Sequence, residues 1–111
     1  MRLPRSYGLQ YMEKYKLLLF PSAKQDLQDI VDYVNELSPD AAIKLYDEIV
    51  EKIGSLSQMP LRCPLIKNLA LKAKGYRVLV VDNYLVFFVV KGKTIEIRRI
   101  LYGRRHYEFL L

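Results

Sequence analysis

The stretch that most constrains the fold is an almost uninterrupted apolar run, YLVFFVV, at residues 84–90. Both of its faces are apolar, so the run predicts a central β-strand that is buried on both sides. The turn signals Asp82-Asn83 and Lys91-Gly92-Lys93 enclose it. Flanking strands are therefore expected at Tyr76–Val81 and Thr94–Tyr102, each joined to the central strand as a hairpin.

A short strand at residues 15–20 and two amphipathic helices are expected before this unit. Ser22 is the predicted N-cap of the first helix, with Gln25 as its capping-box partner. The second helix is expected to begin at Ser38-Pro39-Asp40, where a cap, a proline and an acid follow one another. Apolar residues recur at helical spacing in both: Ala23, Leu27, Ile30, Val31, Val34 and Leu37, then Ala42, Leu45, Ile49, Ile53 and Leu56. The short link predicts an antiparallel helical hairpin.

The order strand, helix, helix, strand, strand, strand predicts an α+β fold. Its small antiparallel sheet would carry the helical hairpin on one face, and its other face would be left to water or a partner. Residues 61–75 form an irregular connection with one helical turn in LALKAK, and a short C-terminal helix is expected at the end of the chain. With 111 residues, the chain has room for one domain. We predict an N-terminal extension at residues 1–11 and the domain at residues 12–111, since Met12 offers an alternative start.

Charge divides the chain into an acidic part and a basic part. Residues 22–61 carry three lysines against eight acids, a net charge of −5, whereas residues 62–111 carry eleven Lys/Arg against three acids, a net charge of +8. This distribution is typical of a surface that binds an anion, and equally of a solvated basic surface. The acidic helix faces are interpreted as solvated surface without metal-ligand spacing, so neither a metal nor a cofactor is predicted.

Few features point to a compartment. No apolar run is long enough to span a membrane, and no secretory signal follows the N-terminal arginines. Cys63 is the single cysteine and cannot form an intramolecular disulfide, which fits a reducing cytoplasm.

Titratable and basic side chains gather in the tail, TIEIRRILYGRRHYEFLL at residues 94–111. Strand alternation places its residues on two faces, neither purely apolar: Ile95, Ile97, Arg99 and Leu101 on one, and Glu96, Arg98, Ile100 and Tyr102 on the other. Glu96 and Arg98 are expected to pair. Arg104, Arg105, His106 and Tyr107 then follow in succession.

These residue types suit RNA cleavage without a metal, in which the ribose 2′-hydroxyl attacks phosphorus. Histidine titrates near neutrality and serves as acid or base, and arginine pairs with phosphate oxygens. Tyrosine stacks on a base or donates from its hydroxyl. The same set would bind a nucleic acid or an acidic protein segment without chemistry. Strand arginines are also commonly structural, and a lone histidine is commonly a surface residue.

Several segments in order resemble the RelE/ParE superfamily, the toxins of type II toxin–antitoxin modules, including the plasmid-stabilisation type. They are YKLLLFPSAKQDLQDIVDYV, SPDAAIKLYDEIVEKI, the exit at Pro60, GYRVLVVDNYLVFFVV and IEIRRILYGRRHYEFLL. The resemblance runs from about Met12 to the end. It implies the α+β fold expected above and a cognate antitoxin that holds the toxin inactive in a hetero-oligomer.

The superfamily divides by target, and this chain has features of both divisions. RelE-like members cut mRNA in the ribosome, and ParE-like members inhibit DNA gyrase. The tail Arg105-His106-Tyr107 is similar to the terminus of YoeB-type ribosome-dependent nucleases, and Arg77 stands where many members have a basic residue. Such nucleases have an arginine just after the tyrosine of the next strand, where this chain has Leu85.

The first hypothesis is therefore ribosome-dependent mRNA cleavage. His106 would be the general acid or base, Arg105 and Arg77 would hold phosphate, and Tyr107 would orient the substrate. The expected RNA-binding or phosphate-binding residues are Arg104, Arg98, Lys74 and Lys72. A gyrase-binding toxin without enzymatic activity is the alternative, and a non-toxic binding module of the same fold is a third.

Overall fold

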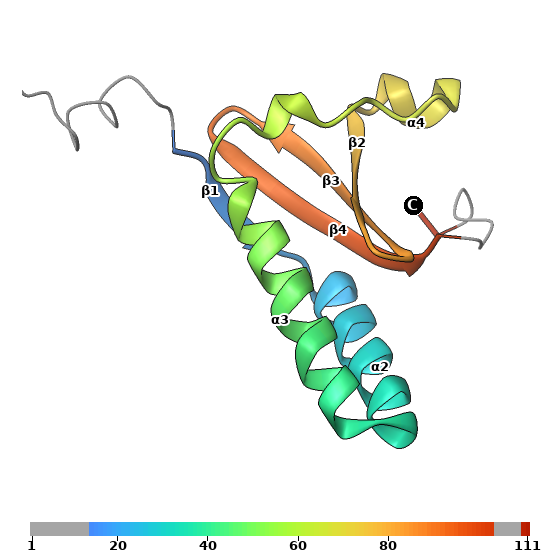
Figure 1. The fold of residues 1–111 in the computed structure, drawn as a ribbon. Coiled ribbons are helices and arrows are strands. Elements are labelled where there is room, and N and C mark those ends of the chain that lie inside the picture. Colours follow the sequence, from blue (N-terminus) through green and yellow to red (C-terminus); the bar gives the residue numbers. More distant parts are fainter. Residues whose placement is uncertain (1–13, 104–109) are drawn as a thin grey trace, which may run out of the picture.

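The structure is a computed structural model that describes residues 14–103 and 110–111 (Figure 1). Its elements are β1 (Lys16–Leu19), α2 (Pro21–Leu37), α3 (Pro39–Ser55), a 3₁₀ turn (Pro60–Arg62), α4 (Leu69–Ala73), β2 (Tyr76–Val81), β3 (Tyr84–Lys91) and β4 (Thr94–Tyr102). The predicted extension at residues 1–11 and the predicted C-terminal helix lie outside the described residues. Within the described ranges, no helix is both long and apolar enough to cross a bilayer.

The strands form one four-stranded sheet in the order β1-β4-β3-β2. The α+β class is confirmed, but the sheet is mixed rather than wholly antiparallel, because β1 pairs with β4 in parallel. The far edge, β2, is partly occupied by the connecting segment: the amide of Ile66 donates to Tyr76 O at 3.0 Å, and that of Val78 donates to Pro64 O at 3.3 Å. The first strand pairs instead with the free edge of β4.

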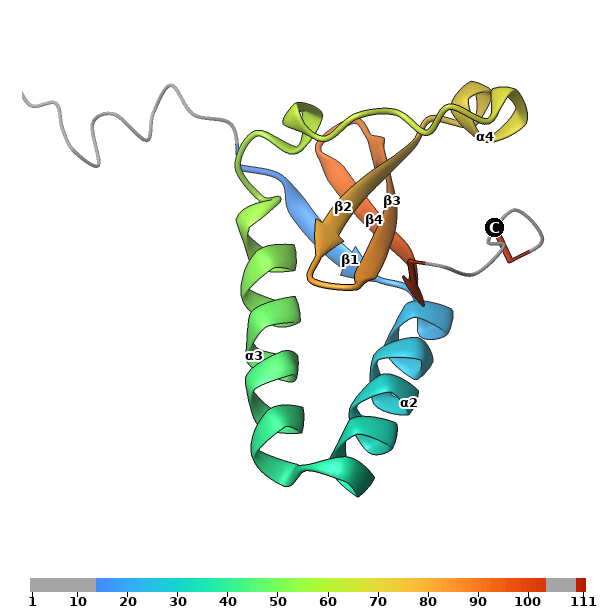
Figure 2. The same cartoon turned by 45° about the vertical axis from the view of Figure 1, so that its right-hand side comes forward.

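Helices α2 and α3 form the predicted antiparallel hairpin, which extends beyond the sheet (Figure 2). Ser38 is the only residue between them. Its Oγ accepts from the amide of Ala41 at 3.3 Å, so the predicted cap of the second helix is confirmed. The predicted Ser22 cap is wrong, because Pro21 already occupies the first turn of α2 and Phe20 stands at the N-cap without a side-chain hydrogen bond.

The helical hairpin covers one face of the sheet, and the main core lies between them (Figure 1). Side chains from both helices meet side chains from β2, β3 and β4. Its most buried large members are Ile49, Leu56, Val81, Val86, Phe88, Ile95, Ile97 and Ile100. Burial of this many apolar side chains is the dominant stabilising contribution to the fold.

The opposite face was expected to be left to water or a partner, and instead it carries a second, smaller core. Ile66 of the connecting segment and Leu71 of α4 pack on Tyr76, Phe87 and Val89. Partly buried Val78, Leu85, Leu110 and Leu111 complete this cluster. The irregular connection therefore covers the second face of the sheet, with α4 forming the predicted helical turn.

Strand β4 contains a β-bulge at its two arginines. Phe88 pairs with Ile97 and Phe87 pairs with Arg99, so Arg98 is the extra residue. The bulge shifts the alternation, and Ile100 therefore joins Ile97 in the main core, while Leu101 joins the second core. The predicted assignment of residues to two regular faces is wrong after Ile97 for this reason.

Candidate functional site

Half of the predicted site residues lie in the tail that the structure does not describe. Arg104, Arg105, His106 and Tyr107 fall within residues 104–109, outside the described part of the chain. Their proposed roles remain predictions. The other four, Arg77, Arg98, Lys72 and Lys74, are described and do not form one cluster.

Arg77 lies on β2 and is held by the segment that precedes α4. Its Nη1 donates to Cys63 O at 2.6 Å and to Leu61 O at 3.5 Å. Arg77 pairs in register with Phe88, whose side chain is in the main core, so the arginine leaves the strand on the side of the helical hairpin. These contacts assign Arg77 to holding the connecting segment against the sheet.

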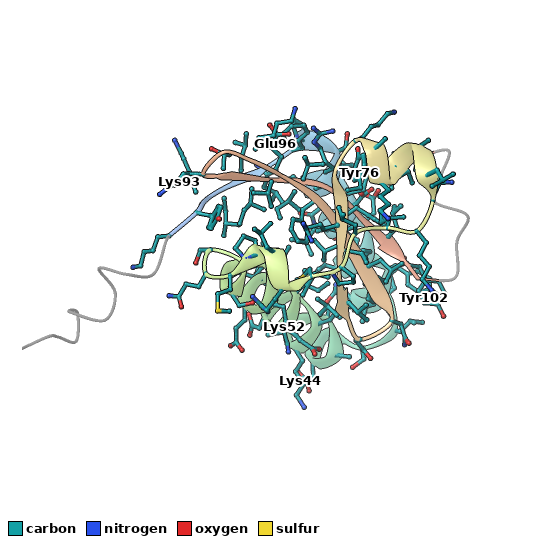
Figure 3. The ribbon with its side chains drawn as sticks, turned by 90° about the horizontal axis from the view of Figure 1, so that it is seen from above. Lys44, Lys52, Tyr76, Lys93, Glu96 and Tyr102 are labelled. Atoms are coloured by element: carbon teal, nitrogen blue, oxygen red, sulfur yellow. The ribbon has the colours of Figure 1, made fainter. Side chains whose placement is uncertain are left out.

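Arg98 emerges on the other face of the sheet, because its guanidinium reaches the hydroxyl of Tyr76, a residue of the second core. It donates to Glu96 Oε1 from Nη2 at 2.6 Å and from Nε at 3.1 Å, and to Tyr76 Oη at 3.2 Å. The predicted Glu96–Arg98 pair is confirmed. Figure 3 shows Tyr76 and Glu96 near one end of the sheet, with Tyr102 at the other.

Aromatic rings enclose the Arg98 guanidinium. Its central carbon lies 4.8 Å from the ring centroid of Phe20 and 5.6 Å from that of Tyr76. Burial lowers the pKa of Arg98, but hydrogen bonds and charge from Glu96, together with Tyr76, raise it more, so the net pKa lies above its ordinary value. The positive charge of the Arg98 guanidinium is already paired with the Glu96 carboxylate, so the side chain is poorly placed to bind a phosphate.

Arg99 belongs to an ion pair that sequence reasoning missed. Its Nε and Nη2 donate to the two carboxylate oxygens of Asp26 at 2.6 and 2.8 Å, and the amide of Ile100 donates to the same carboxylate at 2.9 Å. Hydrogen bonding to Asp26 is the main reason that the pKa of Arg99 is raised, with burial opposing it. Asp26, expected to be solvated surface, therefore binds α2 to the edge of β4 just beyond the end of β1.

Lys72 and Lys74 are exposed at α4, which covers the second face of the sheet. Arg98 and α4 share that face, because Leu71 packs in the same cluster as Tyr76. Arg77 points to the opposite side of β2. The structure therefore separates Arg77 from the other described basic residues that were expected to bind RNA.

Leu85 lies where the resembling nucleases have an arginine, and its surroundings are apolar. A cavity of about 260 Å³ opens beside it on the second face of the sheet. The cavity is lined by Pro64, Leu65, Ile66, Lys67, Val78, Leu85 and Phe87. Lys67 is the only charged residue in this set, so the position offers an apolar contact surface rather than a phosphate site.

Neither a metal centre nor a catalytic cluster emerges from the described residues. In residues 14–103 and 110–111, no group of three or more His, Cys, Asp or Glu side chains is arranged to hold a metal ion. Cys63 is buried, and burial raises the pKa of its thiol, with Arg62 and Arg77 opposing the rise. The buried thiol is therefore poorly suited to act as a nucleophile.

Comparison with protein families decides the class of the molecule. The model of the ParE toxin of type II toxin–antitoxin systems matches residues 17–107, which include the α2–α3 hairpin, α4 and all of the sheet except the first residue of β1. The chain belongs to the ParE toxin family. It is the toxin component of a type II toxin–antitoxin module, and its partner in such a module is an antitoxin.

Solved structures agree with this assignment. A chain of the chromosomal ParDE system from P. aeruginosa shares 29% identity over 81% of this chain and 97% of that one, with a TM-score of 0.68. A chain of the RelBE2 toxin–antitoxin complex from Mycobacterium tuberculosis has 24% identity over 80% of this chain and 98% of that one, with a TM-score of 0.53, which supports the shared fold alone. Among curated protein sequences, none matches significantly.

Proposed function

We propose that this ParE-family toxin acts by binding a protein target, DNA gyrase, and does not cleave RNA. The observation that carries the proposal is Leu85, which lines an apolar cavity where ribosome-dependent nucleases of the superfamily have a phosphate-gripping arginine. Cleavage by the 2′-hydroxyl route develops charge on phosphate, and free cationic donors must stabilise that charge. An apolar side chain cannot supply this stabilisation.

The internal pairing of the described arginines supports the same conclusion. Arg77 donates to two backbone carbonyls, Arg98 is paired with Glu96 and Arg99 is paired with Asp26. Releasing any of them toward an RNA phosphate would leave a carboxylate or carbonyl without its partner, which costs free energy. A protein–protein mechanism needs no such release. We place the action in the cytoplasm, where both gyrase and the ribosome operate.

The alternative of ribosome-dependent mRNA cleavage depends on Arg105, His106 and Tyr107. Their residue types suit acid–base chemistry and phosphate binding, but they lie outside the described residues. Under this alternative, His106→Ala and Arg105→Ala abolish cleavage. Under our proposal, the wild-type protein produces no cleavage for these substitutions to abolish.

Two assays on the purified toxin separate the candidates. The first measures plasmid supercoiling by DNA gyrase, and we expect the wild-type toxin to inhibit it and added antitoxin to restore it. The second maps new mRNA 5′ ends in a translating extract, and we expect none. New 5′ ends that disappear in His106→Ala, with gyrase unaffected, would overturn the proposal. If expression of the protein does not inhibit growth, the third hypothesis, a non-toxic binding module of the same fold, would be favoured instead.

A further inference from the structure

A cavity larger than the one beside Leu85 opens on the helix side of the sheet, where α2 extends beyond the ends of the strands. Its volume is about 530 Å³, and it is lined by Asp29, Ile30, Tyr33, Tyr84 and Tyr102. Tyr84 begins β3, and Tyr102 ends β4 as its partner in register. Their rings meet edge to face, with centroids 5.8 Å apart and an interplanar angle of 74°. We call this cavity the tyrosine pocket.

Tyr33 lines the tyrosine pocket from α2, and 63% of its surface is exposed. Tyr102 is 41% exposed. Exposed tyrosines grouped around a cavity are typical of the centres of protein interfaces, where one ring face contacts the partner and the hydroxyl stays hydrated. Among the described residues, Tyr33 belongs to neither of the two hydrophobic cores.

Negative charge lies beside these rings. Asp29 is exposed on α2, and one of its carboxylate oxygens accepts a hydrogen bond from Gln25 Nε2 at 2.8 Å. Asp82 lies in the two-residue turn that leads into Tyr84. Burial, then Tyr102, Asp82 and Tyr33, raises the pKa of Tyr84 above its ordinary value. The described residues that line the tyrosine pocket include no lysine or arginine.

The chain itself shows what such a combination binds. Elsewhere, the Arg98 guanidinium lies against the rings of Phe20 and Tyr76 and pairs with the Glu96 carboxylate. The described lining of the tyrosine pocket has the same parts, aromatic faces and a carboxylate, and contains no guanidinium. Cations are attracted to aromatic faces, and more strongly when a carboxylate lies beside them.

We propose that the tyrosine pocket receives an arginine or lysine side chain of the toxin's protein target. The inference rests on the proposed function, in which that target is DNA gyrase. Proteins that bind DNA present basic surfaces to its phosphates. The α2–α3 hairpin is acidic, since residues 22–61 carry three lysines against eight acids, so it complements such a surface.

Binding of purified DNA gyrase to the full-length toxin tests the pocket directly. We expect Tyr33→Ala and Asp29→Lys each to weaken gyrase binding by about tenfold or more, as is usual for an anchor residue. Tyr33→Phe keeps the ring face and should bind within about twofold of the wild type. Both side chains are exposed, so melting temperatures should remain close to the wild-type value.

Tyr46→Ala and Asp47→Lys on α3 are matched controls. They make the same chemical changes on an exposed tyrosine and an exposed aspartate of the same hairpin, outside the tyrosine pocket. We expect both controls to bind gyrase like the wild type. Equal losses in Asp47→Lys and Asp29→Lys would overturn the proposal, because net charge rather than the pocket would then explain binding.

Two further readouts separate failure of the pocket from failure of the proposed function. If Tyr33→Ala and Asp29→Lys inhibit gyrase as strongly as the wild type, the proposed role of the pocket is overturned, while gyrase remains the target. The same conclusion follows if these variants lose only antitoxin binding. A wild-type toxin that never binds gyrase would overturn the proposed function. In that case, growth inhibition in cells tests the pocket. The pocket is supported if both pocket variants lose toxicity while both control variants keep it. It is overturned if all four variants remain toxic.

Discussion

The two faces of the sheet are covered in very different ways. Two 17-residue helices cover one face, whereas a five-residue helix and an irregular segment cover the other. Neighbouring residues Phe87 and Phe88 are both fully buried, one in each core. The difference shows that full burial of a side chain does not require extensive regular structure above it. It also predicts that the two faces respond differently to the same substitution.

The largest expected effect comes from truncating these two phenylalanines. Phe88→Ala should lower the free energy of unfolding by about 4 kcal/mol, because the paired helices cannot collapse into the space. Phe87→Ala should cost about 3 kcal/mol, because it lines the open cavity beside Leu85 and water can enter. Denaturant unfolding of the purified toxin measures both values. Equal losses would contradict the distinction between the faces.

The Arg99–Asp26 pair is the next largest test, because it ties the helical hairpin to β4. The two side chains are 22% and 12% exposed, so each loses a well-shielded partner in Asp26→Ala or Arg99→Ala. We expect each to cost about 2–3 kcal/mol, and the double variant to cost little more than either alone. A double-mutant cycle in denaturant provides the coupling energy. Additive losses would show that the pair is not coupled.

Truncation of α4 should have a smaller effect that stays on its own face. Leu71→Ala removes the anchor of α4 and should cost about 2 kcal/mol, because a five-residue helix can settle into the vacated space. Hydrogen exchange should quicken in α4 and β2 and remain slow in β4. Ile49→Ala in the main core serves as the control and should quicken exchange in both helices. Equally faster exchange throughout the sheet in Leu71→Ala would contradict independent behaviour of the two faces.

The smallest expected effect is a pH dependence at the end of the helix-covered face. Tyr84 has a raised pKa in the folded chain, so unfolding favours its ionisation. Its contribution to stability is therefore complete below the ordinary tyrosine pKa of about 10 and is lost as pH rises through the folded value. Tyr84→Phe should flatten the decline, and Asp82→Asn should move tyrosinate absorbance toward lower pH. An unchanged titration in Asp82→Asn would exclude Asp82 as a cause.

Much of the fold was predictable from local patterns. The apolar run at residues 84–90 identified a strand buried on both faces. Asp82, in the turn before this strand, has a positive φ of 54°, which aspartate tolerates. Ser38 was recognisable as a cap because cap, proline and acid follow one another. The Glu96–Arg98 pair was also predictable, since residues two apart on a strand point the same way.

Features that join distant segments were not predictable. The bulge at Arg98 depends on how β4 pairs with β3, and regular alternation misplaced the residues after it. Two helices and two strands lie between the elements that carry Asp26 and Arg99, and periodicity gives no sign of their pairing. The tyrosine pocket unites Tyr33, Tyr84 and Tyr102 in the same way. Each depends on tertiary packing, which a single sequence does not encode locally.

The parallel pairing of β1 with β4 has a consequence for synthesis of the toxin. Residues 16–19 pair with residues 94–97, so the strand that is synthesised first cannot pair until the last strand has been synthesised. The α2–α3 hairpin has local contacts and can form early, whereas closing the sheet carries the entropy of a loop nearly as long as the domain. We expect the nascent chain to remain without its finished sheet until its end leaves the ribosome. Cells that make this toxin therefore have the whole duration of its synthesis in which to supply an antitoxin.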